Sequence, residues 1–232
     1  MVWITGGARV IAVTDIPCPA IPEGVRLRLL SGPSGAVRRD LRAETRRQLS
    51  VLASSLTDGE GSLRETVRGP VGCGAWQDFG MSLAYADHRA LVVVARGWRV
   101  GVDLLADQQV PEWPAVAALY LRQAADVARL PEAQQSLAYA AAWVELEAEL
   151  KCLGMPLREG WRPPADARAV RLTPQIPQAV AAVVLRPVAQ PPRLRRPWWS
   201  TVLSILHRLH ATNRSRQDSL HHRGHREHRG RC

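Results

Sequence analysis

Two apolar segments in the middle of the chain, residues 90–95 and 99–105, constrain the fold more than any other feature of the sequence. The first reads Ala-Leu-Val-Val-Val-Ala and the second reads Arg-Val-Gly-Val-Asp-Leu-Leu. Both are rich in aliphatic residues, many of them β-branched, which favour strands over helices. Because only residues 96–98 separate them, the sequence predicts two paired strands joined by a turn at that point.

The segments on either side of this pair alternate between strand, loop and helix patterns. Helices are indicated by apolar residues that recur at helical spacing, and two of them begin with a proline at a plausible first helical position. The predicted elements are a strand at 9–16, a helix at 37–56, a loop at 59–74, helices at 114–129 and 131–153, and strands at 167–172 and 179–185. We expect the last helix to stop at Gly154. This order favours an α+β fold over a regular βαβ alternation.

Positive charge is concentrated in the C-terminal tail. Residues 193–232 contain ten arginines and two acidic residues, so they carry +8 of the formal net charge of +10. The rest of the chain is therefore close to neutral, and a hydrophobic content of 46% is enough for a buried core. The tail combines a short amphipathic segment at 198–209 with a low-complexity His/Arg-rich end. Such a tail is expected to contact anionic surfaces without binding a specific nucleic acid.

Cysteine usage and the N-terminal segment indicate a cytoplasmic protein. The four cysteines, Cys18, Cys73, Cys152 and Cys232, are far apart and include no CxxC pair, so we expect free thiols. Arg9 and Asp15 interrupt the apolar start of the chain, which makes it unlike a signal peptide. The protein is also expected to be a monomer.

Two short motifs contain the residues that are candidates for chemistry. Asp103 follows Gly101 at the end of the second central strand, where a lone aspartate is commonly a turn or cap residue. Trp143, Glu147 and Lys151 are spaced four apart in the helix 131–153 and therefore share one face. Taken alone, Glu147 and Lys151 could be a surface ion pair worth about 0.3–0.5 kcal/mol. Lys151 is the single lysine of the chain, against 30 arginines.

Taken together, the two motifs resemble the signature of the 4′-phosphopantetheinyl transferase superfamily. That signature is G-x-D-x-E at a strand end, followed by W-x-x-x-E-[AS]-x-x-K on a helix. The chain length is similar to that of the larger, surfactin-type members, and the resemblance covers about residues 8–190. It implies two similar α+β subdomains that form a pseudo-dimer. We place these subdomains at residues 1–104 and 105–192, and the basic tail at 193–232.

The resemblance implies an enzyme that uses coenzyme A and Mg²⁺. A serine of an acyl or peptidyl carrier protein would attack the β-phosphate of coenzyme A, which releases 3′,5′-ADP. By motif match, Asp103 and Glu147 would bind Mg²⁺ together with the diphosphate. Lys151 would help to deprotonate the serine or would hold a phosphate, so Lys151 and Glu147 are the expected catalytic residues.

The sequence differs from the family pattern at two positions. Leu105 stands where many members have a third acidic residue, and Tyr85 stands where the family has a histidine that contacts coenzyme A. Arg68 resembles a family cation that binds the nucleotide phosphates, although an ordinary loop arginine is an equal alternative. Arg47, within an arginine-rich helix, is a further candidate for a phosphate contact, while a solvated helix face is the alternative for most of these arginines.

Two other functions are compatible with the sequence. The two departures, Leu105 and Tyr85, are compatible with a relative that binds coenzyme A or a carrier protein without efficient turnover. The basic tail is compatible with a protein that binds nucleic acid or an anionic surface. Turnover in the presence of magnesium would distinguish the first alternative, and removal of residues 193–232 would distinguish the second.

Overall fold

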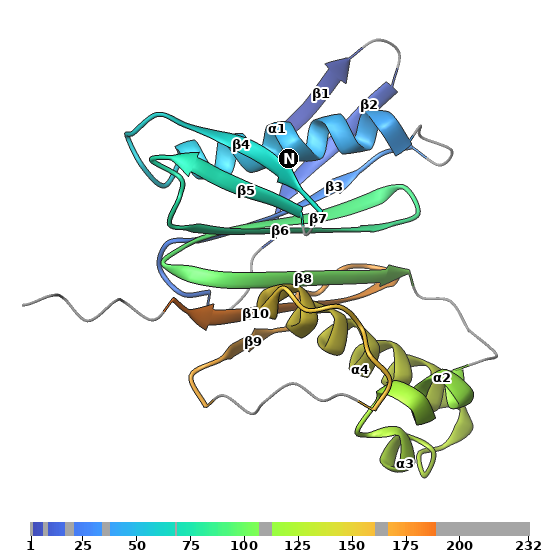
Figure 1. Cartoon of the computed structure of the whole chain (residues 1–232). Coiled ribbons are helices and arrows are strands. Elements are labelled where there is room, and N and C mark those ends of the chain that lie inside the picture. Colours follow the sequence, from blue (N-terminus) through green and yellow to red (C-terminus); the bar gives the residue numbers. More distant parts are fainter. Residues whose placement is uncertain are drawn as a thin grey trace, which may run out of the picture. The chain divides into compact units, whose positions relative to one another are not determined.

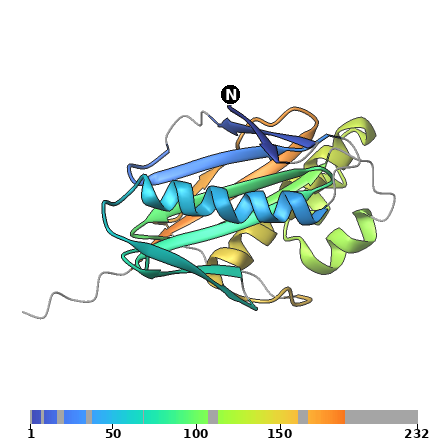
Figure 2. The ribbon, with the colours of Figure 1, turned by 90° about the horizontal axis from the view of Figure 1, so that it is seen from above.

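The first half of the chain forms an antiparallel sheet with the strand order β1-β2-β3-β7-β6 (Figure 1). The computed structural model describes residues 2–6, 9–16, 21–33, 38–67, 69–106, 113–160 and 167–188. The strands of this sheet are β1 (Val2–Gly6), β2 (Arg9–Asp15), β3 (Val25–Ser31), β6 (Phe79–Ala86) and β7 (Arg89–Arg96). Helix α1 (Arg38–Ser54) follows β3 and covers one face of the sheet, as the view from above shows (Figure 2).

The second half forms a smaller antiparallel sheet with the order β8-β10-β9. Its strands are β8 (Trp98–Ala106), β9 (Val170–Leu172) and β10 (Ala179–Pro187), and its helices are α2 (Trp113–Tyr120), α3 (Ala124–Val127) and α4 (Glu132–Leu153). The fold class is therefore α+β with antiparallel sheets, as the order of elements predicts.

The expected pairing of the two central segments is wrong. They form β7 and β8, but β7 pairs with β3 and β6 in the first sheet, whereas β8 pairs with β10 in the second. Gly97, at a φ of 75°, connects the two strands and turns the chain from one sheet into the other. The interior of β7 is buried on both faces. This strand lies inside its sheet between β3 and β6 and does not form a hairpin with β8.

The two sheets pack against each other through one apolar cluster. Leu91 and Val93 of β7 face Val102 of β8 and Val183 of β10 in this cluster. Alternate residues of β7, such as Val92, point the other way and pack under α1. The resulting layers are a helix, two stacked sheets and a second group of helices, with α4 on the outer face of β8 and β10 (Figure 1).

Several sequence predictions are confirmed and others are corrected by these elements. The helix expected at 37–56 is α1, and the helix expected at 131–153 is α4, which ends at Gly154. Gly154 has a φ of 65°, and the N–H of Met155 donates to the carbonyl of Leu150, which closes the last turn. The single helix expected at 114–129 is instead α2 and the short α3. The expected loop at 59–74 contains the hairpin of β4 (Gly61–Thr66) and β5 (Gly69–Gly74).

The chain divides into two units after residue 188, and residues 1–188 form the first, compact one. The predicted tail, with its amphipathic segment at 198–209, lies outside the described residues. Within the first unit, the change from one sheet to the other occurs at Gly97, inside the segment 1–104 that was assigned to the first subdomain. Across the described part of the chain, no helix combines the length and apolar character needed to cross a membrane.

Candidate active site

The site is built where helix α4 touches strand β8, and a glycine makes that contact possible. A Cβ atom at Gly101 would lie 1.9 Å from the carbonyl oxygen of Ala148 and 2.4 Å from the backbone nitrogen of Cys152. Real Cβ atoms do not approach backbone atoms so closely, so any side chain at 101 would push the helix away. The glycine of the first motif therefore sets the distance between the strand and the helix that carries the second motif.

Strand alternation points Asp103 toward α4. Val102 and Leu104 face the cluster between the two sheets, so Gly101, Asp103 and Leu105 face the helix layer. The side chain of Asp103 is only 14% exposed. A carboxylate with so little contact with water needs a partner, and α4 provides one.

Lys151 is the partner of Asp103. Its Nζ atom donates a hydrogen bond to Oδ1 of Asp103 at 2.7 Å and a second one to the carbonyl oxygen of Val102 at 3.2 Å. The two charged residues are 48 positions apart in the chain, so a tertiary contact brings the two motifs together. The alternative of a Glu147–Lys151 surface ion pair is not what the structure contains, because the ammonium is bound to Asp103.

Glu147 lies one helical turn before Lys151 on α4 and completes a group of two carboxylates and one ammonium. Burial raises the pKa of Glu147, and the negative charge of Asp103 raises it further, while the charge of Lys151 opposes both. Burial also raises the pKa of Asp103, against the charge and hydrogen bond of Lys151 and a hydrogen bond from the N–H of Leu104. Both carboxylates therefore lie where an additional positive charge would stabilise their ionised forms.

The donor set suits a small divalent cation. Carboxylate oxygens are hard ligands, and Mg²⁺ commonly takes one or two of them and completes its shell with water and substrate phosphates. Leu105 faces the same side as Asp103 and packs against the apolar cluster under α4. Its side chain is aliphatic and supplies no third oxygen. Among the described residues, no three His, Cys, Asp or Glu side chains are grouped to hold a metal. A cation at Asp103 and Glu147 would therefore need further ligands from beyond the described residues, such as water or substrate phosphates.

Trp143, the first residue of the second motif, has a packing role. Its ring lies 5.8 Å from that of Trp113 and 6.0 Å from that of Tyr120, measured between centroids. These contacts fasten α2 to α4 two turns before Lys151.

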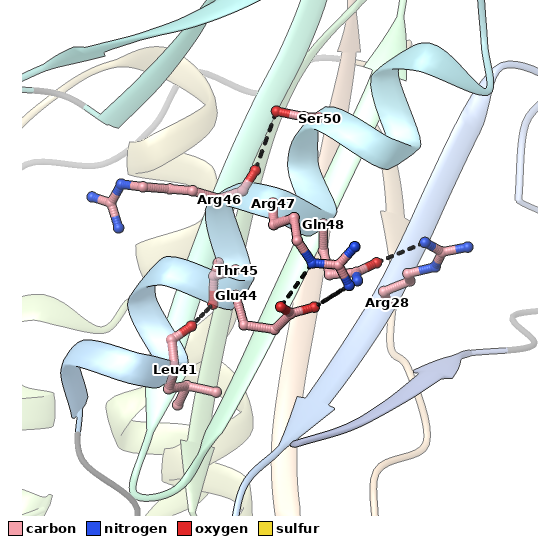
Figure 3. Close-up of polar contacts among 8 residues, drawn as sticks. All are labelled: Arg28, Leu41, Glu44, Thr45, Arg46, Arg47, Gln48 and Ser50. Carbon is pink, nitrogen blue, oxygen red and sulfur yellow. Dashed lines mark hydrogen bonds and ion pairs between the residues drawn. The ribbon is translucent and has the colours of Figure 1, made fainter. Parts of the chain in front are cut away.

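The structure does not bring Arg47 to this group. Arg47 lies on α1, where its Nε and Nη2 atoms donate to Glu44 at 2.8 and 2.6 Å, and this pair is drawn in Figure 3. Glu44 also accepts from Gln48, which in turn accepts from Arg28 of β3 (Figure 3). The charge of Arg47 is thus already balanced on its own helix.

Tyr85 and Arg68 are the remaining residues predicted to contact coenzyme A. Tyr85 packs against the cluster between α1 and the first sheet, on the opposite side of that sheet from β8. Its hydroxyl is buried and has no hydrogen-bond partner among the described residues. Arg46 lies nearby, and its pKa is raised mainly by Glu65 and to a smaller extent by Tyr85. Arg68 lies outside the described residues.

Sequence reasoning missed two contacts that support the site. The buried hydroxyl of Ser82 on β6 accepts a hydrogen bond from the N–H of Val102 at 3.1 Å, which ties the first sheet to the strand that carries Asp103. Glu149, whose side chain is 6% exposed, pairs with Arg186 of β10 and Arg171 of β9. The sequence contained one indication of the second contact. Glu149 falls between Glu147 and Lys151 but on a different face of the helix, so it needs a different partner.

Comparison with known proteins adds no family to this description. No protein-family model matches the chain, and neither does any curated protein sequence.

Proposed function

We propose that this protein transfers the 4′-phosphopantetheine group of coenzyme A to a serine of an acyl or peptidyl carrier protein, with Mg²⁺ as cofactor. One observation carries the proposal. Lys151 of the second motif is hydrogen-bonded to Asp103 of the first, across the contact between Gly101 and Ala148. The resemblance rests on these two motifs, and this contact brings residues of both motifs together, as a shared active site requires.

The roles of the three residues follow from their chemistry. Asp103 and Glu147 would hold Mg²⁺, which when bound offsets negative charge on the diphosphate and the leaving group. Lys151 would stabilise a phosphate oxygen or accept the proton of the serine hydroxyl. Its side chain is 36% exposed, so the amine can reach a substrate bound at the surface. Lysine can act as a base after losing its proton, whereas arginine stays charged.

The two halves of the fold support the expected pseudo-dimer as part of this proposal. Each half consists of an antiparallel sheet with a helix on its outer face, α1 on one and α4 on the other. Coenzyme A is an extended molecule, so its nucleotide could contact residues that are remote from the cation. Contacts with Arg68, Tyr85 and Arg47 remain predictions of the resemblance.

A second candidate function is a weakened relative that binds coenzyme A or a carrier protein with little turnover. Leu105 favours it, because this position supplies an apolar contact in place of a third carboxylate. The placement of Tyr85 favours it as well, since the hydroxyl is buried on the α1 side of the first sheet.

Mass spectrometry of carrier proteins distinguishes the two candidates. Apo carrier proteins would be incubated with the full chain, coenzyme A and Mg²⁺, and the expected product is heavier by one phosphopantetheine group. The Asp103→Ala variant and a reaction with a chelator serve as controls. Binding of coenzyme A without any gain in carrier mass, over a panel of acyl and peptidyl carriers, would support the weakened relative instead.

A further inference from the structure

The ammonium of Lys151 contacts one oxygen of the Asp103 carboxylate. It donates to Oδ1 of Asp103 and to the carbonyl oxygen of Val102, while the N–H of Leu104 also donates to the Asp103 carboxylate. With 14% of the side chain exposed, Asp103 has little room for another partner. A cation that binds this carboxylate therefore comes close to the ammonium.

We infer that Lys151 and a divalent cation compete for Asp103, so that cation binding releases Lys151 from its ion pair. The inference rests on the proposed function in one respect, the assignment of the cation to Asp103 and Glu147. It adds that, without the cation, Lys151 is paired with Asp103, and that binding of the cation makes the amine of Lys151 available to substrates.

Electrostatics explains why the two cations exclude each other. Both would contact the carboxylate of one residue, which places a divalent and a monovalent positive charge within a few ångströms of each other. Repulsion at this distance is strong where little water screens it, and Asp103 is largely buried.

The divalent cation has an advantage that the ammonium lacks. Glu147 lies one helical turn before Lys151 on α4 and, among the described residues, makes no ion pair. In the described part of the chain, the only carboxylate within ion-pair distance of the ammonium is that of Asp103, whereas a cation between Asp103 and Glu147 would neutralise both. Lys151 has a flexible stem and is 36% exposed, so it can swing into solvent once the cation has entered.

The single lysine of the chain makes the exchange directly observable. Full-length protein labelled with ¹³C at lysine Cε gives one lysine side-chain resonance in NMR spectra, which would be followed while Mg²⁺ is added without coenzyme A. We expect the resonance to move toward the position of a free lysine as Mg²⁺ binds. The same titration of Asp103→Asn should show neither binding nor movement.

Calorimetry of Mg²⁺ binding provides a second test that does not depend on activity. Lys151→Met should bind Mg²⁺ about tenfold more tightly than the wild type, because one competing, partly buried charge is removed. Lys151→Arg retains a competing cation and should stay close to the wild type. Arg158→Met removes an exposed positive charge just beyond α4 and controls for the change in net charge.

The outcomes separate the two proposals. If Mg²⁺ binds through Asp103 and Glu147 but the lysine resonance stays in place, or Lys151→Met binds no more tightly, the competition is refuted and the cation site stands. If neither the wild type nor Lys151→Met binds Mg²⁺, in the presence or absence of coenzyme A, the cation site itself is refuted, and the competition with it.

Discussion

The outer surface of α1 and the contact between β8 and α4 both carry several charges, but they balance them in opposite ways. On α1, Arg47 pairs with Glu44 and Arg46 pairs with Glu65 of β4, and both arginines remain in contact with water. Between β8 and α4, the carboxylates of Asp103 and Glu147 lie partly removed from water near one ammonium, which is paired with Asp103. Each of these two pairs on α1 is complete within the chain, whereas the group between β8 and α4 has an excess of negative charge that a ligand can neutralise.

A binding site is thus expected where charge is unbalanced and partly removed from water. The number of arginines on a helix does not predict such a site. The arginine-rich α1 was a reasonable candidate for binding phosphates because of its sequence. Exposed pairs of this kind are worth little, about 0–1 kcal/mol, and solvent screens their field.

The largest expected effect is the loss of transfer on removal of a carboxylate from the β8–α4 group. Asp103→Ala and Glu147→Ala should each lower the rate of carrier modification by at least about a hundredfold, because each removes a proposed cation ligand. Initial rates measured by mass spectrometry, with circular dichroism to check folding, provide the test. A folded variant that keeps a rate within about tenfold of the wild type would refute the assigned site.

Gly101→Ala should break the contact that creates the group. The new Cβ would overlap the Ala148 carbonyl oxygen at 1.9 Å, so we expect a loss of about 3 kcal/mol or more in the free energy of unfolding. Gly160→Ala is the matched control, because it has a positive φ of 68° but open space around the new atom, and should cost about 1 kcal/mol. Equal losses in urea denaturation would show that α4 can move away from β8 without cost.

Lys151→Arg tests whether the site needs a base or only a positive charge. Arginine can keep the ion pair with Asp103 but does not lose its proton near neutral pH, so transfer should fall by about tenfold or more while stability is retained. Initial rates at saturating coenzyme A would be compared. An arginine variant with full activity would show that position 151 contributes a cation alone.

Glu147→Gln should stabilise the protein at neutral pH. A raised pKa means that the folded state favours the protonated carboxyl, so this group contributes stability as the pH falls through the raised pKa and loses it as the pH rises. Removing the charge should therefore raise the free energy of unfolding by less than about 1 kcal/mol at pH 7. Thermal melting from pH 4 to 8 should show the two proteins converging at acid pH. A variant that is less stable at every pH would contradict the claim that the negative charge of Glu147 destabilises the folded protein.

Arg47→Ala should have the smallest effect, since about half of the Arg47 side chain is exposed to water, with a relative exposure of 49%. We expect a change within about 0.5 kcal/mol in stability and no change in the KM for coenzyme A. Glu44→Ala is a useful companion, because it frees Arg47 from its present partner. A severalfold rise of KM in Arg47→Ala would show that this arginine leaves Glu44 to bind a phosphate.

Local patterns in the sequence were sufficient for the two long helices, α1 and α4, and for naming the residues of the candidate site. The limits of α4, its end at Gly154 and the shared face of Glu147 and Lys151 follow from helical periodicity and capping, which depend on neighbours a few residues away. The resemblance also singled out Asp103 before any geometry was known.

Tertiary structure alone decided which segments meet. The sequence predicted that residues 90–95 and 99–105 would pair, yet Gly97 sends them into different sheets, because each apolar strand is paired with strands from elsewhere in the chain. The same long-range packing places Lys151 on Asp103 instead of Glu147 and leaves Tyr85 on the far side of the first sheet. Strand pairing and helix docking are determined by contacts between distant residues, which no local periodicity encodes.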